Sequence, residues 1–126
     1  MSAIEPKILT LLKNNTGVSA LVSSRIFPVM ADEPPTYPHI VYFRTPAGHF
    51  VNSLSGFSGL ENPIFQIDCM ATTYLGAKAV SDAVKLAMNG ATTFKSTCWN
   101  EEDMPFDIEL QVYGVSLDFS IWNQKG

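Results

Sequence analysis

The chain has 126 residues, a formal net charge of −4 and 46% hydrophobic residues, so it can fold as a single domain over residues 1–126 without disulfides or a structural metal. Its 12 acidic residues outnumber its 8 basic ones, which argues against a surface that grips nucleic-acid phosphates, because such binding needs a basic stripe. It has neither a secretory start nor an apolar run of about 18 residues, so we expect neither export nor membrane insertion.

The first 24 residues predict a helix followed by a short helical stub. Ser2 and Glu5 have the spacing of a capping box, and Pro6 lies in the first turn, where its missing N–H costs least. Apolar residues then recur on one helical face at Ile4, Ile8, Leu11 and Leu12. A polar segment over residues 14–17 ends this helix, and residues 18–22 repeat the helical spacing for one turn.

Residues 25–62 predict two extended segments and an arm. Pro28 confines residues 25–29 to a sheet edge or a non-strand segment, because proline cannot donate to a ladder. Residues 38–45 are β-branched and aromatic on both faces, which is typical of a central or doubly covered strand. Residues 46–62 mix glycine, serine and asparagine with spaced apolar residues. They form either a hairpin folded onto its own domain or an arm whose apolar side meets a partner.

The next part of the chain predicts a strand and the clearest helix. Residues 63–71 alternate apolar and polar side chains, the period of a half-buried strand. Thr72 or Thr73 can then cap a helix that has one apolar face, and Asn89 and Gly90 supply a left-handed stop.

The last part predicts two strands separated by an acidic loop. Residues 94–100 form the first strand, residues 101–107 the loop, and residues 113–121 the second strand, with residues 123–126 as a frayed tail. The element order indicates an α+β fold: a single twisted, mainly antiparallel sheet of four to five strands, with two main helices on one face and a long hairpin-like arm.

No pattern for catalysis or cofactor binding is present in the sequence. Cys69 and Cys98 are too few for a four-ligand zinc site and are expected to be free thiols, with a disulfide between neighbouring strands as the alternative. His39 and His49 lack partners at metal-ligand spacing, so structural or surface roles are expected. We therefore expect no catalytic residue, no cofactor and no metal.

Three groups of residues remain as candidates for chemistry or contacts. Asp68 and Asp118 face the polar side of their strands, where two solvated carboxylates are far commoner than a catalytic dyad. The predicted acidic loop carries four carboxylates of a solvated connection: Glu101, Glu102, Asp103 and Asp107. The arm carries the candidates for a protein interface: His49, Phe50, Val51, Leu54, Phe57 and Leu60.

Four blocks in order resemble the tail-completion or tail-terminator proteins of long-tailed, siphovirus-type bacteriophages and prophages. The blocks are residues 25–28 (RIFP), 37–42 (YPHIVY), 65–74 (FQIDCMATTY) and 115–122 (VSLDFSIW). The similarity spans nearly the whole chain, from about Ile8 to Trp122.

The resemblance implies a non-enzymatic virion structural protein. Members of that family form a ring, usually a hexamer, on the head-proximal end of the tail tube; the ring ends tube polymerisation and joins the tail to the head connector. The implied partners are further copies of the chain, the tail tube protein, the head-tail connector protein and DNA that passes through the lumen without specific binding, with no membrane. The resemblance makes the acids of the predicted loop the candidates for facing the lumen or the connector: Glu101, Glu102, Asp103 and Asp107. The implied location is the head-proximal end of the virion tail, assembled in the bacterial host cytoplasm. The alternatives are a head-closure or other minor neck or tail protein and, from a different class, a small ligand-binding or enzymatic α+β domain.

Overall fold

A computed structural model describes residues 4–31, 34–45, 49–53 and 56–124 of the chain. The helices are α1 (Ile4–Asn14), α2 (Thr16–Val22) and α3 (Tyr74–Asn89). The strands are β1 (Ile26–Pro28), β2 (His39–Arg44), β3 (His49–Ser53), β4 (Gly56–Asn62), β5 (Ile64–Ala71), β6 (Lys95–Asp107) and β7 (Val112–Gln124).

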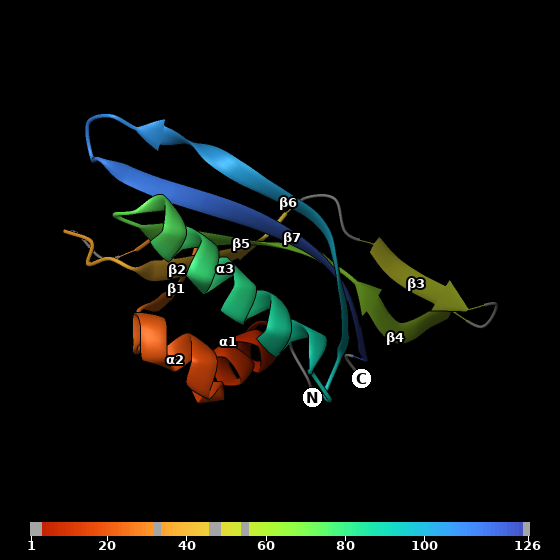
Figure 1. Cartoon of the computed structure of the whole chain (residues 1–126). Coiled ribbons are helices and arrows are strands. Elements are labelled where there is room, and N and C mark those ends of the chain that lie inside the picture. The colour runs from red at the N-terminus through yellow and green to blue at the C-terminus, as the bar shows by residue number, and fades with distance from the viewer. Residues whose placement is uncertain (1–3, 32–33, 46–48, 54–55, 125–126) are drawn as a thin grey trace.

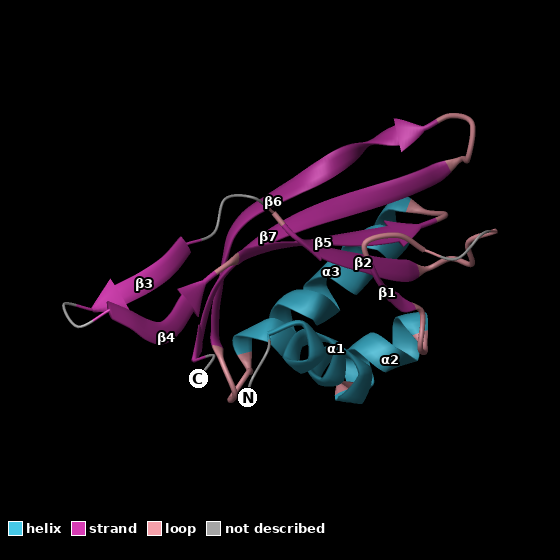
Figure 2. Ribbon diagram, turned by 180° about the vertical axis from the view of Figure 1, so that it is seen from behind, coloured by secondary structure: helices cyan, strands magenta, loops and turns pink. Residues whose placement is uncertain are grey.

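Five strands form the central sheet, and the three helices cover one of its faces (Figure 1). The strand order is β1-β2-β5-β7-β6; β1 pairs with β2 in parallel and every other pair is antiparallel. The α+β class, the mainly antiparallel sheet and the single helix-covered face are as predicted. Viewed from behind, the opposite face of the sheet carries none of the three described helices (Figure 2).

The core lies between the helices and alternate residues of β5 and β7. Strand β5 buries Phe65, Ile67, Cys69 and Ala71, which is the alternation that the sequence predicts. Strand β7 buries the matching set Val115, Leu117, Phe119 and Ile121. Helix α1 adds Ile4, Ile8 and Leu12 at intervals of four residues, and α3 begins at the predicted Thr73 cap, whose side chain accepts a hydrogen bond from the Gly76 N–H.

The predicted arm is a β-hairpin of β3 and β4. Strand β4 is attached to the end of β7 by two residue pairs, Leu60 with Gln124 and Glu61 with Asn123. Both views show the hairpin projecting from the end of the sheet, clear of the three helices (Figures 1 and 2). Leu54 and residues 46–48 lie outside the described residues.

The prediction of an acidic loop over residues 101–107 is wrong. These residues continue the strand that begins at Lys95, and β6 pairs with β7 from Lys95 opposite Trp122 to Asp107 opposite Val112. The chain turns instead between Asp107 and Val112.

Two smaller predictions are also wrong. The tail is not frayed from residue 123, because β7 runs to Gln124 and Asn123 is buried; residues 125 and 126 lie outside the described part. Gly90 does cap α3, but with φ −91° instead of a left-handed φ, and its N–H donates to carbonyl oxygens of the last turn.

Both thiols are free, as expected, with Cys69 buried and Cys98 partly buried. Strands β5 and β6, which carry them, lie on opposite sides of β7. This placement excludes the disulfide between neighbouring strands.

Shortening a buried side chain of the central strand β7 should strongly destabilise the domain. Leu117→Ala should lower the free energy of unfolding by about 2–5 kcal/mol, because Leu117 is fully buried and the truncation leaves a cavity. Leu110→Ala, in the exposed turn after β6, is the control and should change it by less than about 0.5 kcal/mol. Urea denaturation measures both; similar losses for the two variants would contradict this account of the core.

Candidate functional site

An ionic cluster joins α3 to β6. The Nζ atoms of Lys78 and Lys85 each lie 2.6 Å from one carboxylate oxygen of Glu101. The Tyr74 hydroxyl donates to the Asp103 carboxylate at 2.8 Å, and Lys78 Nζ lies 3.8 Å from the same carboxylate. Two of the predicted lumen candidates, Glu101 and Asp103, are therefore held against a helix of their own subunit.

The cluster favours the charged forms of Glu101, Lys78 and Lys85 and the neutral form of Tyr74. The hydrogen bonds from Lys78 and Lys85 keep the pKa of the Glu101 carboxyl below its usual value. The same bonds raise the pKa of both lysines, and the bond to Asp103 raises the pKa of the Tyr74 hydroxyl. None of these pKa shifts produces a nucleophile or a base near neutral pH. The cluster therefore has a structural role, which is to hold α3 against β6.

The helix-free face of the sheet carries acids that, among the described residues, form no ion pair with lysine. Asp68, Ser116 and Glu102 form one row across β5, β7 and β6, and the next row is Gln66, Asp118 and Asn100. The Gln66 amide donates to Asp68 at 2.9 Å, and the Asn100 amide donates to Asp118 at 3.1 Å. These two carboxylates are each bonded to a neutral amide, which fits solvated strand residues instead of a catalytic dyad.

The four predicted lumen candidates thus have different surroundings. Glu102 belongs to the helix-free face, whereas Glu101 and Asp103 lie against α3. The Asp107 carboxylate accepts the Leu110 N–H at 3.0 Å and so caps the turn after β6.

An apolar groove of about 260 Å³ occupies one corner of the helix-free face. Its floor includes Met70 and Met104, whose side chains meet above Gly114; a Cβ at that glycine would lie 2.7 Å from both sulfur atoms. Val29 and Met30, at its rim, are more than two thirds exposed. Thioether side chains adapt to different partners, so this groove is a candidate contact surface.

His39 lies at the border of this groove and has a structural role. Its Nδ1 lies 3.0 Å from the Thr36 carbonyl oxygen, and its ring packs against Tyr37 at 4.9 Å between centroids. Burial lowers the pKa of the imidazole, which favours a neutral ring that donates from Nδ1. The side chain of His49 lies outside the described part.

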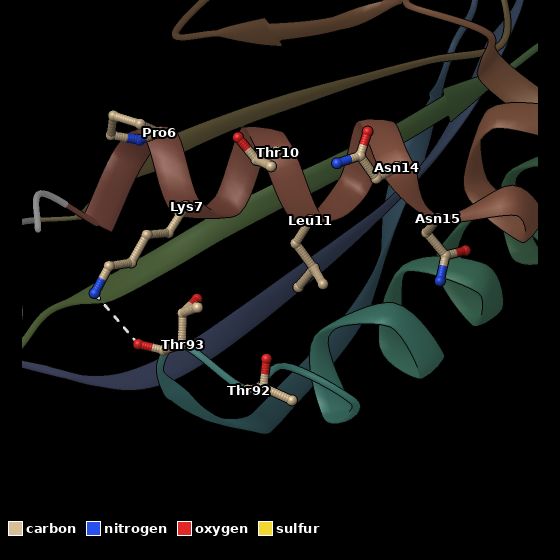
Figure 3. A pocket seen from close by; sticks show the side chains of 8 residues that line it. All are labelled: Pro6, Lys7, Thr10, Leu11, Asn14, Asn15, Thr92 and Thr93. Atoms are coloured by element: carbon tan, nitrogen blue, oxygen red, sulfur yellow. Dashed lines mark hydrogen bonds between the residues drawn. The ribbon is translucent and has the colours of Figure 1, made fainter.

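A larger cavity, of about 490 Å³, lies between α1 and the residues that precede β6 (Figure 3). Lys7 reaches across it and donates to the Thr93 carbonyl at 3.2 Å and to the Asn123 side-chain oxygen at 2.5 Å. The rest of its lining is hydroxyl, amide and apolar groups: Pro6, Thr10, Leu11, Asn14, Asn15 and Thr92. The lining therefore offers neither a general base nor a thiol, and Lys7 serves as a tether.

The edge of the sheet beside α3 has exposed apolar residues that the sequence analysis missed. Leu86 of α3 is 75% exposed and borders a cavity of about 410 Å³ next to β6, and Trp99 of β6 is 59% exposed. In the sequence, Leu86 falls off the apolar face of the α3 helix, which is the signal that could have identified it. The turn after β6 exposes Ile108 and Leu110 in the same way.

The arm candidates His49, Phe50 and Val51 lie on β3, and Phe57 and Leu60 lie on β4. The structure places these five residues on one hairpin by their backbone, and the orientation of their side chains is outside the described part. Their role in an interface stays a prediction.

Among the described residues, no group of three or more histidine, cysteine or acidic side chains is placed to hold a metal ion. None of the described helices is long and apolar enough to cross a bilayer.

Comparison with known proteins finds a family model and a solved structure of similar fold. Residues 6–124 match the family model described as Tail completion protein gp17. The fold is similar to a solved chain from the "Virion of native gene transfer agent (GTA) particle", with a TM-score of 0.71 and 14% sequence identity over 95% of this chain and 93% of that chain. No protein in the curated set matches the sequence.

The ionic cluster between α3 and β6 should give a pH-dependent contribution to stability. Glu101→Gln should lower the free energy of unfolding by about 1 kcal/mol at pH 7, because two partly exposed ion pairs are lost. Since the folded-state pKa of Glu101 is lowered, its contribution is present above the usual carboxyl pKa and is lost as the pH falls through the lowered value. The difference between variant and wild type should therefore vanish under strongly acidic conditions.

The neighbouring acid supplies the control for this prediction. Glu102→Gln removes the same charge from the opposite face of β6, where no lysine is paired with it in the described part. Urea denaturation at pH 7 should leave this variant within about 0.5 kcal/mol of wild type. An equal loss for both variants would mean that the cluster contributes nothing specific.

Proposed function

The chain belongs to the Tail completion protein gp17 family, and from this membership we propose that it forms a ring that caps the head-proximal end of the tail tube. It is a structural, non-enzymatic component of a phage-type virion tail. In the proposed role the ring is built of six copies, ends polymerisation of the tube protein and joins the tail to the head connector. Assembly takes place in the cytoplasm of the bacterial host.

The observation that carries this proposal is that different contact surfaces lie at opposite ends of one small domain. The hairpin of β3 and β4 projects from one end, and the exposed turn after β6 lies at the other (Figure 1). The apolar groove lies towards the second end, because its lining includes Met70 and Met104, near the ends of β5 and β6. Contacts between unlike surfaces of identical subunits generate a closed ring when the rotation between neighbours closes. A ring of this kind also has two non-equivalent faces, one available to the tube and one to the connector.

The arm is the proposed contact with the neighbouring subunit or the tail tube. It combines apolar residues with a short attachment to the domain: β4 pairs with β7 at two positions, and the Asn62 side chain donates to Ser120 and to the Ile121 carbonyl. The interface residues proposed are those that the sequence nominated: His49, Phe50, Val51, Leu54, Phe57 and Leu60.

The helix-free face is the proposed lumen surface, past which DNA slides without specific binding. Its acids Asp68, Glu102 and Asp118 have no cation paired with them in the described part of the chain. A surface of this charge repels phosphates and offers none of the counterion release on which DNA adhesion depends. Glu101 and Asp103 support the proposal less, because lysines of α3 compensate their charge.

Electron microscopy of purified tail tubes mixed with labelled protein tests the capping role. We expect label at one end of each tube and no further elongation when tube protein is added. Label on portal-bearing heads and not on tubes would instead indicate a head-closure protein, and label on neither would refute both roles.

The arm can be tested in the same assay. Phe50→Asp combined with Phe57→Asp should reduce the fraction of capped tubes at least about tenfold, since charges would replace two apolar contacts. Leu75→Asp combined with Ala79→Asp adds the same two charges at exposed positions of α3, away from the arm, the groove and the turn after β6, and should leave capping unchanged. Unchanged capping by the arm variant, with normal circular dichroism, would rule out the arm as an interface.

The lumen assignment predicts a change in DNA binding on charge reversal. Assembled rings of Glu102→Lys should bind a short duplex DNA with an affinity that falls steeply with salt, whereas wild-type rings should not bind it. Asp82→Lys makes the same charge change on α3, which covers the other face of the sheet (Figure 1). Fluorescence anisotropy measures binding; equal binding by both variants would place Glu102 outside the lumen.

A further inference from the structure

Strand β6 has an open edge. It is 13 residues long and pairs with β7 along one side only, and in the described part of the chain no strand covers its other side. Such an edge presents a row of backbone N–H and C=O groups that can pair with another extended segment.

A cavity accompanies this edge. It has a volume of about 410 Å³, lies between α3 and β6, and is lined in part by Leu86, Cys98 and Phe119. Leu86 is 75% exposed there. A strand added to β6 would run beside this cavity and could place alternate side chains in it. Edge pairing together with side-chain pockets is the geometry by which proteins bind a strand of a partner.

We propose that the open edge of β6 receives β3 of a neighbouring copy, so that the sheets of adjacent subunits join through backbone hydrogen bonds. This inference rests on the proposed ring and names the contact that builds it. The occupant is a second copy of this chain, and the cavity beside Leu86 is the pocket that β3 covers.

The other edges of the chain are unsuited to this pairing. Strand β1 has three residues and ends in Pro28, and its outward groups are used locally: the Ile26 N–H donates to the Ser24 carbonyl at 2.8 Å, and the Pro28 carbonyl accepts the Met30 N–H at 2.8 Å. A second β6 would place the acidic run of residues 101–103 of both copies in one sheet, which like-charge repulsion disfavours.

Strand β3 has none of the features that exclude β1 and a second β6 as the partner of the open edge. Its five residues, His49–Ser53, include no acidic side chain and no proline. It pairs with β4 on one side and forms the end of the strand order on the other. It also projects beyond the body of the domain, where a neighbouring subunit can reach it (Figure 2). Because β3 and β6 are different strands, the contact is heterologous and can repeat around a ring.

A matched pair of leucine variants tests the receiving edge. Leu86→Lys places a charge beside the cavity and should weaken ring formation at least about tenfold, measured by native mass spectrometry over a dilution series. Leu75→Lys makes the same change at a residue of α3 that is 78% exposed but does not line the cavity, and should leave the ring intact. Unchanged assembly of Leu86→Lys, or equal weakening by Leu75→Lys, would overturn the inference.

Cross-linking to Cys98 tests whether β3 of the neighbouring copy is the strand that pairs with β6. Each of the five β3 residues is replaced in turn by cysteine, and assembled rings are oxidised with copper phenanthroline; Cys69 is fully buried and does not compete. We expect covalent oligomers with a period of two along β3, and none after Cys98→Ser. Rings that cap tubes but cross-link at no position would overturn the inference and leave the capping function standing. Rings that cross-link but fail to cap tubes would confirm the contact and refute that function.

Discussion

The double pairing of β7 is the constraint on which the rest of the structure depends. This strand pairs with β5 on one side and β6 on the other, and its buried residues Val115, Leu117, Phe119 and Ile121 meet the helices. Its last residues also carry the hairpin through β4. Each contact surface is therefore fixed relative to the others by one strand, because the groove, the open edge and the arm all attach to it or to its direct neighbours.

Local sequence patterns predicted the helices and strands in which buried and exposed residues recur with a regular period. The β5 strand, the apolar face of α3 and the Thr73 cap follow from nearby residues alone. The second half of β6 does not, because its acidic residues resemble a solvated loop. What makes it a strand is the partner β7 and the lysines of α3, and Lys78 lies 23 residues from Glu101. Pairing at that separation leaves no periodic signal in the sequence.

The arm and the acids of β6 were predictable to different degrees, because the arm has a local sequence pattern whereas the surroundings of the acids depend on distant residues. The arm is recognisable because spaced apolar residues stand in a glycine-rich segment, and its hairpin form is confirmed. Whether an acid of β6 is paired with a lysine of α3 depends on the face of β6 that it occupies. A bulge between Cys98 and Asn100 shifts that alternation, so it cannot be counted from the start of the strand.

Because Met70 and Met104 both pack above Gly114, the side-chain sizes at these three positions depend on one another. Each belongs to a different strand, and the missing side chain at residue 114 is the space that the two thioethers fill. Any increase in size at one position must be offset at another. Among diverging members of the family, these three positions should therefore change together, and a bulky residue on β7 should accompany smaller ones on both neighbours. The groove would then keep its depth while the side chains on its floor changed. The same fold could therefore bind a partner whose own surface changes.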